Sequence, residues 1–412
     1  MNLVSEIGYS TATNVKTHNK ISLLNHIRFT PGGISRADLA RKMGLSRAAI
    51  SSIVNDLLEI NIIREAADGP ATGGRRAVLL EINPECGYVL GVDMGATHLG
   101  LVLADFSARV NAEDEYPFDV SLGPHECLKI VDQQVREFLE QNEFSLDDIV
   151  AIGVGVPGPV VSEKGGVIVP PIMPGWDNFP IRSHLENLWG HPVTLNNDSE
   201  LGALGEWAYG AGRAEDNLLY IKVGYGIGAG LLLDGHIYSG ATGSAGEIGH
   251  ITINDQGPMC TCGNRGCLEA LAGGRAIAEQ ARKAIQSGKR TQLARIKPVE
   301  KITALDVAME ARKGDLVAQE IITNAGQYLG IAIASLINVV NPRMIVIGGG
   351  VAQMGDLLLE PIRRSAATRS LPAAARVVRI TAAVLGRRSS GMGAVVQALS
   401  LALHKLVETA YL

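Results

Sequence analysis

The sequence lacks two features that would place the chain at a membrane. It does not begin with a basic segment followed by an apolar core, so residues 1–8 do not resemble a secretory signal peptide. It also lacks an uninterrupted apolar run long enough to span a bilayer. We therefore expect a soluble cytoplasmic protein with no membrane partner.

Aromatic residues are scarce and glycine is abundant. Aromatic side chains make up 4% of the 412 residues, whereas 48 residues are glycine. This mixture is typical of an α/β protein with many tight turns between strands and helices. Hydrophobic residues account for 46% of the chain, which is ample for packed cores. The length predicts two or three domains.

The charges are unevenly distributed along the chain. The whole chain has a formal net charge of −5, but residues 1–84 contain ten Lys or Arg and seven Asp or Glu. This head therefore carries a net charge of +3, and the remaining body carries −8. A basic head on an acidic body favours an anionic partner for the head alone. We place the boundary between them at Asn83 and Pro84.

The head contains three predicted helices. Apolar residues at helical spacing mark residues 18–28 as the first helix. A capping box at residues 35–38 starts a second helix, and Ser46 can cap a third. On the third helix, one face repeats with helical period and should be buried. The residues of that face are Ile50, Ile53, Val54, Leu57 and Leu58.

The opposite face of the third helix is small and polar, as a helix in a DNA major groove requires. A predicted two-stranded wing follows at residues 62–65 and 75–81, with a basic tip that could reach phosphates or a minor groove. These features resemble a winged helix-turn-helix, and a small protein-interaction domain is the alternative. The predicted DNA-binding residues are Arg47, Ser51, Ser52, Asn55, Arg75 and Arg76.

Three of the five cysteines lie in one short, glycine-rich window downstream of a histidine. His250, Cys260, Cys262 and Cys267 together form a complete tetrahedral donor set for Zn²⁺. Because the protein would fill all four positions, the zinc would be structural. Free thiols or a disulfide are the alternatives. Two glutamates, Glu247 and Glu269, flank this loop and are suited to binding hydroxyl groups.

The body contains two predicted β-hairpins with glycine-rich turns, one in each half. Their strands lie at residues 88–93 and 99–104, and at residues 218–223 and 231–233. This repetition predicts an internally duplicated fold whose two lobes close over a nucleotide and a second ligand. The turns could face the phosphates and Mg²⁺ of a nucleotide, and a later triglycine turn could accept adenine. The residues concerned are Asp93, Gly95, Thr97, Gly224, Gly226 and Gly349.

Asp198 follows a short predicted strand, at the start of a helix predicted for residues 199–209. In this position its carboxylate could accept a proton from a sugar hydroxyl as a general base. The alternative is that Asp198 is simply the helix N-cap.

Taken together, these motifs resemble the ROK family (repressor, open reading frame, kinase) over essentially the whole chain. The resemblance rests on residues 93–97, 155–158, 197–198 and 246–250 and on the cysteine loop with Glu269. It implies an α/β, two-lobed, actin/hexokinase-like fold behind the winged helix-turn-helix. The first lobe would comprise residues 85–197, completed by a C-terminal helix at residues 389–412. The second lobe, residues 198–388, would carry the zinc loop and the surface that forms a homodimer or homotetramer.

The resemblance also implies that a monosaccharide binds in the cleft between the lobes. Its contacts would be Asn197, Asp198, Glu247, His250 and Glu269, with His250 also serving as a zinc ligand. Because a winged helix-turn-helix precedes the body, the chain resembles the repressor branch, which includes xylose, glucose and N-acetylglucosamine repressors. We therefore expect a sugar-responsive repressor that binds operator DNA and is not an enzyme.

One position departs from the family's kinases. These usually have Thr in the second phosphate turn, where its hydroxyl contacts phosphate, but this chain has Tyr225. The larger phenol counts against binding of ATP and Mg²⁺. An ATP-dependent hexose or N-acetylhexosamine kinase, with Asp198 as its base and the head as an accessory, is the alternative function. A cleft that docks a protein in place of a sugar is a third.

Overall fold

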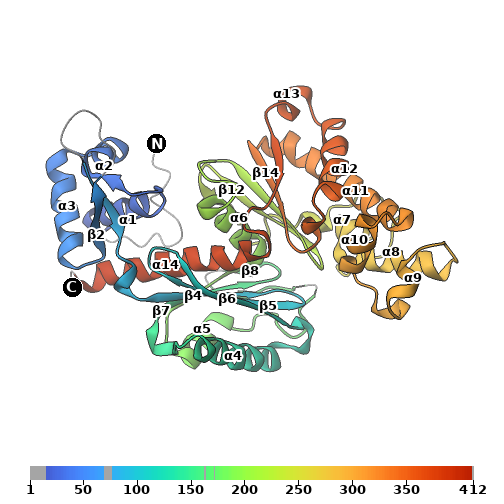
Figure 1. Cartoon of the computed structure of the whole chain (residues 1–412), viewed down its shortest axis with the longest axis horizontal. Helices are drawn as coiled ribbons and strands as arrows, with labels where there is room; N and C mark the ends of the chain where they lie inside the picture. Colours follow the sequence, from blue (N-terminus) through green and yellow to red (C-terminus); the bar gives the residue numbers. More distant parts are fainter. Residues whose placement is uncertain (1–14, 69–76, 162–163, 171, 411–412) are drawn as a thin grey trace.

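The computed structural model describes residues 15–68, 77–161, 164–170 and 172–410. The chain folds into three parts, which are a mainly helical head, a first lobe and a second lobe (Figure 1). The predicted wing tip, with Arg75 and Arg76, lies outside the described residues.

The head contains the predicted helix-turn-helix. Ser35 accepts a hydrogen bond from the Asp38 amide and so caps α2, and Ser46 accepts one from the Ala49 amide and caps α3. The wing sheet has three strands in the order β1-β3-β2, one more than predicted. The head's elements are α1 (Val15–Arg28), β1 (Ile34–Ser35), α2 (Arg36–Met43), α3 (Arg47–Glu59), β2 (Ile63–Asp68) and β3 (Val78–Ile82).

The first lobe is built on a five-stranded sheet with the order β10-β7-β4-β5-β6. Helices α4 and α5 cover one face of this sheet, and α14 crosses the other (Figure 1). A short hairpin of β8 (Val160–Val161) and β9 (Gly166–Val167) adjoins the sheet. The lobe's other elements are β4 (Tyr88–Met94), β5 (His98–Asp105), β6 (Val110–Pro117), α4 (Pro124–Gln141), β7 (Ile149–Val156), α5 (Ile181–Trp189) and β10 (Val193–Asn197).

The second lobe repeats this architecture with the sheet order β13-β12-β11-β14-β15. In both sheets three parallel strands are followed by two antiparallel ones, as internal duplication predicts. The strands are β11 (Leu218–Val223), β12 (Ile227–Leu233), β13 (His236–Ile237), β14 (Met344–Gly348) and β15 (Arg379–Ala382). The helices are α6 (Asp198–Tyr209), α7 (Leu268–Ala272), α8 (Gly274–Gln286), α9 (Leu293–Ile296), α10 (Ala304–Arg312), α11 (Leu316–Val340), α12 (Asp356–Ala367) and α13 (Pro372–Ala375).

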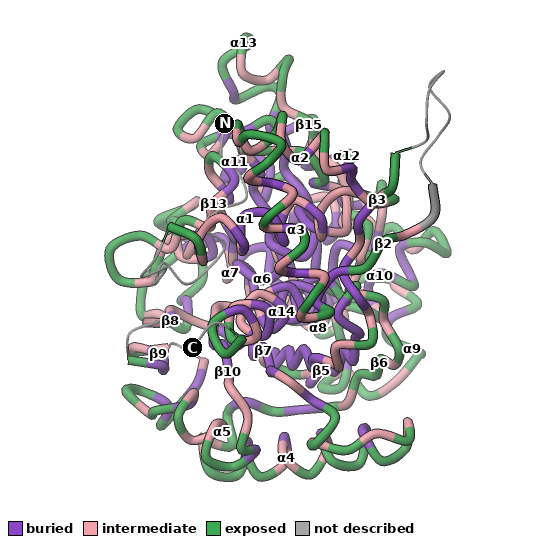
Figure 2. The backbone as a smooth tube through the Cα atoms, turned by 90° about the vertical axis from the view of Figure 1, so that its left-hand side faces the viewer, coloured by how far each residue is buried: buried purple, intermediate pink, exposed green. Residues whose placement is uncertain are grey.

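Buried residues lie in the interior of the molecule, whereas many residues on the outer turns of the helices are exposed (Figure 2). The core of the second lobe lies between its sheet and α7, α8, α10, α11 and α12. Helix α11 begins at Leu316, which is 79% exposed. Asp315 caps this helix by accepting a hydrogen bond from the Ala318 amide.

Helix α14 (Ser389–Ala410) connects all three parts of the molecule. It packs on β4 and β7 of the first lobe, on α6, and on α1 of the head. By length and composition, the described segment 386–410 could cross a membrane, but 67% of its most apolar window is buried inside the protein. Its hydrophobic character is accounted for by its place in a core that joins the head to the first lobe.

Three glycines allow α14 to lie unusually close to its neighbours. A Cβ on Gly153 of β7 would lie 2.1 Å from the Ala394 carbonyl oxygen, and one on Gly91 of β4 would lie 2.5 Å from that of Gly391. On α14 itself, a Cβ on Gly393 would lie 1.8 Å from the Leu201 carbonyl oxygen of α6. All three clashes involve backbone atoms, so side chains could not relieve them by rotating.

We expect Gly153→Ala to destabilise the protein. The added methyl group would push α14 away from the sheet, and overpacking of this kind costs about 1–3 kcal/mol. Gly100→Ala in β5 is the matched control, because the nearest atom to its new Cβ is at an ordinary contact distance of 3.6 Å. Urea denaturation should show a lower unfolding midpoint for Gly153→Ala only. Equal midpoints for both variants would contradict this close packing.

Candidate sugar cleft, metal cluster and DNA-binding face

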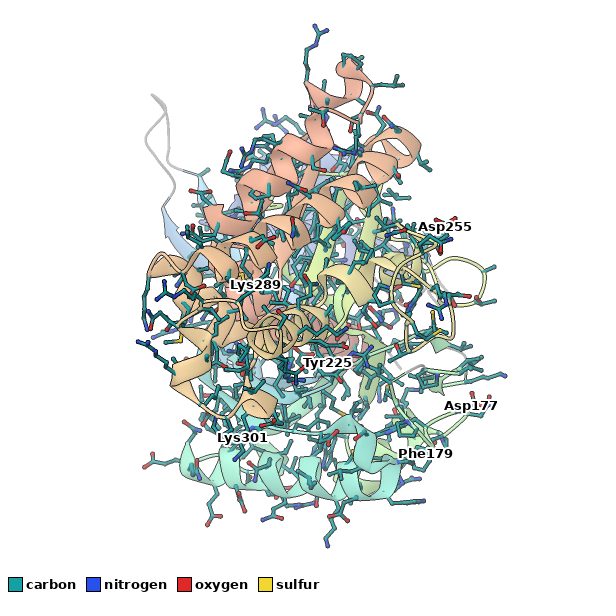
Figure 3. All side chains as sticks on the ribbon, turned by 90° about the vertical axis from the view of Figure 1, so that its right-hand side faces the viewer. Asp177, Phe179, Tyr225, Asp255, Lys289 and Lys301 are labelled. Carbon is teal, nitrogen blue, oxygen red and sulfur yellow. The ribbon has the colours of Figure 1, made fainter. Side chains whose placement is uncertain are left out.

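A cavity of about 770 Å³ lies between the two lobes. All five residues predicted to contact sugar line it, namely Asn197, Asp198, Glu247, His250 and Glu269. Of the predicted nucleotide-site residues, Thr97, Gly224, Gly226 and Gly349 also line it, but Asp93 and Gly95 do not. Tyr225, which is 43% exposed, lines the cavity and lies between the helices of the second lobe and α4 of the first (Figure 3).

Asn197, and not Asp198, is the N-cap of α6. The Asn197 side-chain oxygen accepts hydrogen bonds from the amides of Ser199 at 2.8 Å and Glu200 at 3.2 Å. Its Nδ2 donates to the Gly158 carbonyl oxygen at 3.0 Å. Asp198 is the first residue of the helix, and its carboxylate is therefore free of the capping role that the sequence left open. Asn197 holds the turn, and Asp198 presents its side chain to the cavity.

Glu269 is held in place by the second glycine-rich turn. Its Oε2 accepts a hydrogen bond from the Ile227 amide at 3.0 Å, and its Oε1 accepts one from the Thr261 hydroxyl at 3.4 Å. A Cβ on Gly226 would lie only 2.2 Å from Glu269 Oε2, so glycine is required for the carboxylate to lie here. This gives Gly226 a structural role in positioning a side chain, separate from any contact with phosphate.

The second glutamate, Glu247, takes up a proton unusually easily. Burial raises the pKa of its carboxyl to about 7, helped by the negative charges of Asp198, Glu269 and Glu200. Several carboxylates facing one cavity repel one another, and hydroxyl groups of a neutral ligand can donate hydrogen bonds to them. A cluster of acidic side chains in this interlobe cavity is therefore suited to a polyhydroxylated, uncharged ligand.

The predicted metal ligands converge. The donor atoms of His250, Cys260, Cys262 and Cys267 all lie within 4.8 Å of one another. Cys262 Sγ lies 3.7 Å from Cys267 Sγ, and Cys260 Sγ lies 3.6 Å from His250 Nδ1. Ligands at tetrahedral zinc with Zn–S of about 2.3 Å are about 3.8 Å apart, so the donor set fits this ion.

The two nitrogens of His250 face different partners. Nδ1 lies on the cysteine side, whereas Nε2 lies 3.8 Å from Glu247 Oε2. One imidazole thus joins the metal cluster to the lining of the cavity. The loop reaches this shape through Gly263 and Gly266, which both have positive φ angles. A Cβ on Gly266 would lie 1.5 Å from the Asn254 carbonyl oxygen, so no other residue fits there.

A buried ionic network, which no motif in the sequence predicted, closes one end of the cavity. Lys222 Nζ lies 3.0 Å from Asp198 Oδ2 and 3.6 Å from Asp93 Oδ2. His98 Nε2 lies 3.3 Å from the same Asp93 oxygen. Burial opposes ionisation of Asp93, but the charge of Lys222 and the contact with His98 outweigh it and lower its pKa to about 2. Nothing in the sequence around Lys222, which lies in a predicted strand, indicated that its side chain would contact Asp93 and Asp198.

In the head, the predicted DNA-binding face of α3 is accessible. Arg47, Ser52 and Asn55 are exposed, and Ser51 is half-buried. Ile50, Val54 and Leu57 on the opposite side are buried, while Ile53 and Leu58 are half-buried. Figure 2 views the molecule from the side on which α3 lies. Arg36 Nη1 of α2 donates to Asn55 Oδ1 at 3.0 Å, which adds to this face a cation that the helical pattern did not indicate.

Residues 89–400 match the ROK family, and residues 17–64 match winged helix-turn-helix DNA-binding domains. The chain belongs to the ROK family. It is 31% identical over 388 residues to the xylose repressor of Caldicellulosiruptor bescii, covering 94% of this chain and 97% of that protein.

Solved structures show the same relationship. The crystal structure of a ROK family transcriptional regulator, a homologue of the Escherichia coli MLC protein, is 31% identical and has a TM-score of 0.80, covering 96% of this chain and 99% of the other. A ROK family glucokinase from Streptomyces griseus, in complex with glucose and AMPPNP, is 28% identical with a TM-score of 0.70. This match covers 76% of this ROK protein and 99% of the glucokinase. The match to the transcriptional regulator, at 96%, therefore covers more of this chain.

We expect Cys262→Ser to lose zinc. Replacing one thiolate with a hydroxyl removes a strong ligand from the cluster, and binding of a structural metal contributes directly to folding free energy. Elemental analysis of the purified protein should give about one zinc per chain for the parent and much less for the variant. Cys86→Ser is the control, because the Cys86 thiol only donates to the Asn61 carbonyl oxygen. Equal zinc in the parent and Cys262→Ser would rule out the cluster as the metal site.

Proposed function

We propose that this ROK protein is a cytoplasmic, sugar-responsive transcriptional repressor, in which a monosaccharide in the cleft between the lobes weakens operator binding. The single observation that carries the proposal is the packing of the helix-turn-helix head onto α14, the helix whose first turn contributes to the cavity lining. Ser390 of that turn lines the cavity, and Arg28 of the head contacts α14 at Val396 and Ser400.

The DNA-binding part of the proposal is supported by the face of α3. Slim side chains at Ala48, Ser51 and Ser52 allow the helix backbone to approach base edges, and Arg47 supplies a cation for bases or phosphates. Arg36 on α2 lies beside this face through its contact with Asn55. Arg75 and Arg76 remain predicted contacts of the wing.

The sugar-binding part is supported by the five polar residues that line the cavity together. A glucokinase of the same family is described in complex with glucose, and a relative is named a xylose repressor. We infer a monosaccharide for this chain as well, held by Asp198, Glu247 and Glu269 as hydrogen-bond acceptors and by Nε2 of His250. Zinc at the cysteine cluster would fix His250 and the loop that leads to Glu269 and would take no part in chemistry.

We also propose that the chain works as a homodimer or homotetramer formed through the second lobe. Both ends of α11 in this lobe carry highly exposed apolar residues: Leu316 is 79% exposed and Val339 is 84% exposed. A symmetric assembly would place two heads on two half-sites of one operator, and a change in the distance between them would weaken binding.

The kinase alternative has one observation in its favour, which is that Asp198 lines the cavity as a catalytic base would. Two observations weigh against it. Tyr225 stands where the family's kinases have Thr, and the Asp198 carboxylate is already paired with Lys222. We therefore favour a binding function and expect no sugar-dependent release of ADP in a coupled assay.

The test of the proposed function is a gel shift at fixed salt, using a genomic fragment selected by the purified protein. Salt must be fixed because phosphate contacts make affinity depend steeply on it. Xylose, glucose, mannose and N-acetylglucosamine are added in turn. One of them should weaken DNA binding by about 5- to 150-fold, the range of ordinary allosteric coupling. Indifference to all sugars, or failure to select any fragment, would contradict the proposal.

We expect Arg47→Ala to weaken operator binding by about 10-fold, because a specific contact from a recognition helix contributes about 1–3 kcal/mol. Sugar affinity, measured by calorimetry, should not change, since Arg47 lies in the head, far from the cavity lining. Arg290→Ala, which removes an exposed arginine from the second lobe, is the matched control. If both variants bind the fragment as the parent does, Arg47 is not part of the interface.

A further inference from the structure

The ionic network around Lys222 joins the two lobes. Lys222 lies on β11 of the second sheet, whereas Asp93 lies on β4 of the first. Its Nζ also donates to Ser390 Oγ at 3.2 Å, and Ser390 in turn donates to the Asp198 carbonyl oxygen at 2.8 Å. The three donors of the ammonium group thus face two carboxylates and one hydroxyl. The lysine and its three partners come from four separate elements of the chain.

The position of Lys222 separates Asp93 from the cavity. Lys222, His98 and Asp198 all line the large cavity, whereas Asp93 is absent from that lining and lines a smaller hollow of about 260 Å³. Lys222 and His98 both contact the Oδ2 of Asp93, and its buried Oδ1 has no hydrogen-bond partner among the described residues. The sequence predicts that Asp93 organises Mg²⁺ and phosphate, and this arrangement offers no support for that prediction. Its carboxylate is turned to an internal cation.

We propose that Lys222 is a resident cation that takes the place of a divalent metal ion between Asp93 and Asp198, so that the cleft binds an uncharged sugar without Mg²⁺ or nucleotide. Mg²⁺ requires oxygen ligands at about 2.0–2.1 Å in octahedral geometry, and an ammonium group between the two carboxylates denies it both. A second cation at this point would also be repelled by the first. The residues present therefore do not fit a Mg²⁺–nucleotide complex.

Tyr225, in the turn that directly follows the strand of Lys222, acts in the same direction. Its backbone forms the second glycine-rich turn, where the Gly224 amide donates to the Gly226 carbonyl oxygen at 2.9 Å. The turn is therefore closed by its own backbone, and the side chain at its tip is a phenol where a phosphate site would need a short hydroxyl. Lys222 and Tyr225, three residues apart, thus replace the metal and the phosphate contact respectively. This inference rests on the proposed function, because it takes the cleft to be a sugar site. It adds that the ligand of this site is an uncharged sugar without Mg²⁺ or nucleotide.

The experiment uses Mn²⁺ as the probe, followed by electron paramagnetic resonance on the full-length, zinc-loaded protein without sugar or DNA. The parent should bind no Mn²⁺ in the cleft. Lys222→Thr removes the ammonium group from between the carboxylates of Asp93 and Asp198 and opens space there, so it should gain one Mn²⁺ site. Lys222→Arg keeps the charge and should gain none. The double variant Lys222→Thr with Asp198→Asn should lose the gained site, which would place it between these carboxylates.

A second measurement on the unmodified protein keeps the proposal testable if Lys222→Thr does not fold. Addition of millimolar Mg²⁺ and AMPPNP should change the affinity for the cognate sugar by less than about two-fold, because a ligand that does not bind cannot be coupled to sugar binding. Binding of Mn²⁺ by the parent, or a strong effect of Mg²⁺–AMPPNP on sugar affinity, would overturn the proposal. A folded Lys222→Thr variant that binds no Mn²⁺ would do the same.

These outcomes are distinct from failure of the proposed function. If no sugar affects DNA binding, the repressor mechanism fails, but the Mn²⁺ measurements still decide the role of Lys222. If instead the sugar releases DNA while the parent binds Mn²⁺ in the cleft, the proposed function stands and the resident cation is wrong.

Discussion

The close packing of α14 against the backbone of the first sheet on one side and of α6 on the other is the constraint on which the rest of the structure depends. Helices usually pack at about 8–10 Å between axes, with side chains between them. Here Gly91 and Gly153 of the first sheet bring its backbone directly against α14, and Gly393 does the same toward α6. A helix held in this way by backbone contacts has little freedom to slide. Any shift of α14 along these neighbours would press backbone atoms together, which rotating side chains could not relieve.

The head is attached to this rigid element by specific contacts. Arg28 donates to the Val396 carbonyl oxygen at 2.7 Å and to Ser400 Oγ at 3.0 Å. Phe29 packs edge-on against Trp207 of α6, with ring centroids 4.9 Å apart. From Ser390 at the cavity to Ser400 at the head is ten residues of helix, about 15 Å. The sugar site and the DNA-reading head are thus joined by one continuous helix, without a flexible linker between them.

Much of this architecture could be predicted from the sequence. The features that could be predicted depend on residues that lie close together in the chain. The candidate metal cluster could be predicted because His250 and the three cysteines lie close together in the chain and need only a tight loop to converge. The helix-turn-helix could be predicted because Ser35 and Ser46 cap helices through local hydrogen bonds. The DNA contacts on the wing and the domain boundaries at residues 84 and 197 remain predictions.

Lys222 could not be found in the same way. Its partners Asp93, Asp198 and Ser390 come from distant parts of the sequence and meet only when the two sheets are brought together. No local pattern distinguishes a lysine in a strand that is buried in an ion pair from one that is solvated. The same holds for the capping of α6, where the sequence left Asp198 as a possible cap and only the backbone geometry assigns this role to Asn197.

A second buried acid shows how the junction between the lobes is fixed. Glu206 of α6 is fully buried, and its carboxylate accepts hydrogen bonds from the amides of Ala211, Val384 and Leu385 and from the Ser389 hydroxyl. It thereby ties α6 to the segment between β15 and α14. An unsatisfied buried charge is costly, and the four hydrogen bonds to Glu206 remove that cost only while α6 and the start of α14 stay together. The Lys222 contacts bridge the two sheets themselves. The two lobes are therefore held together by a buried acid at the start of α14 and by a buried cation at the cleft.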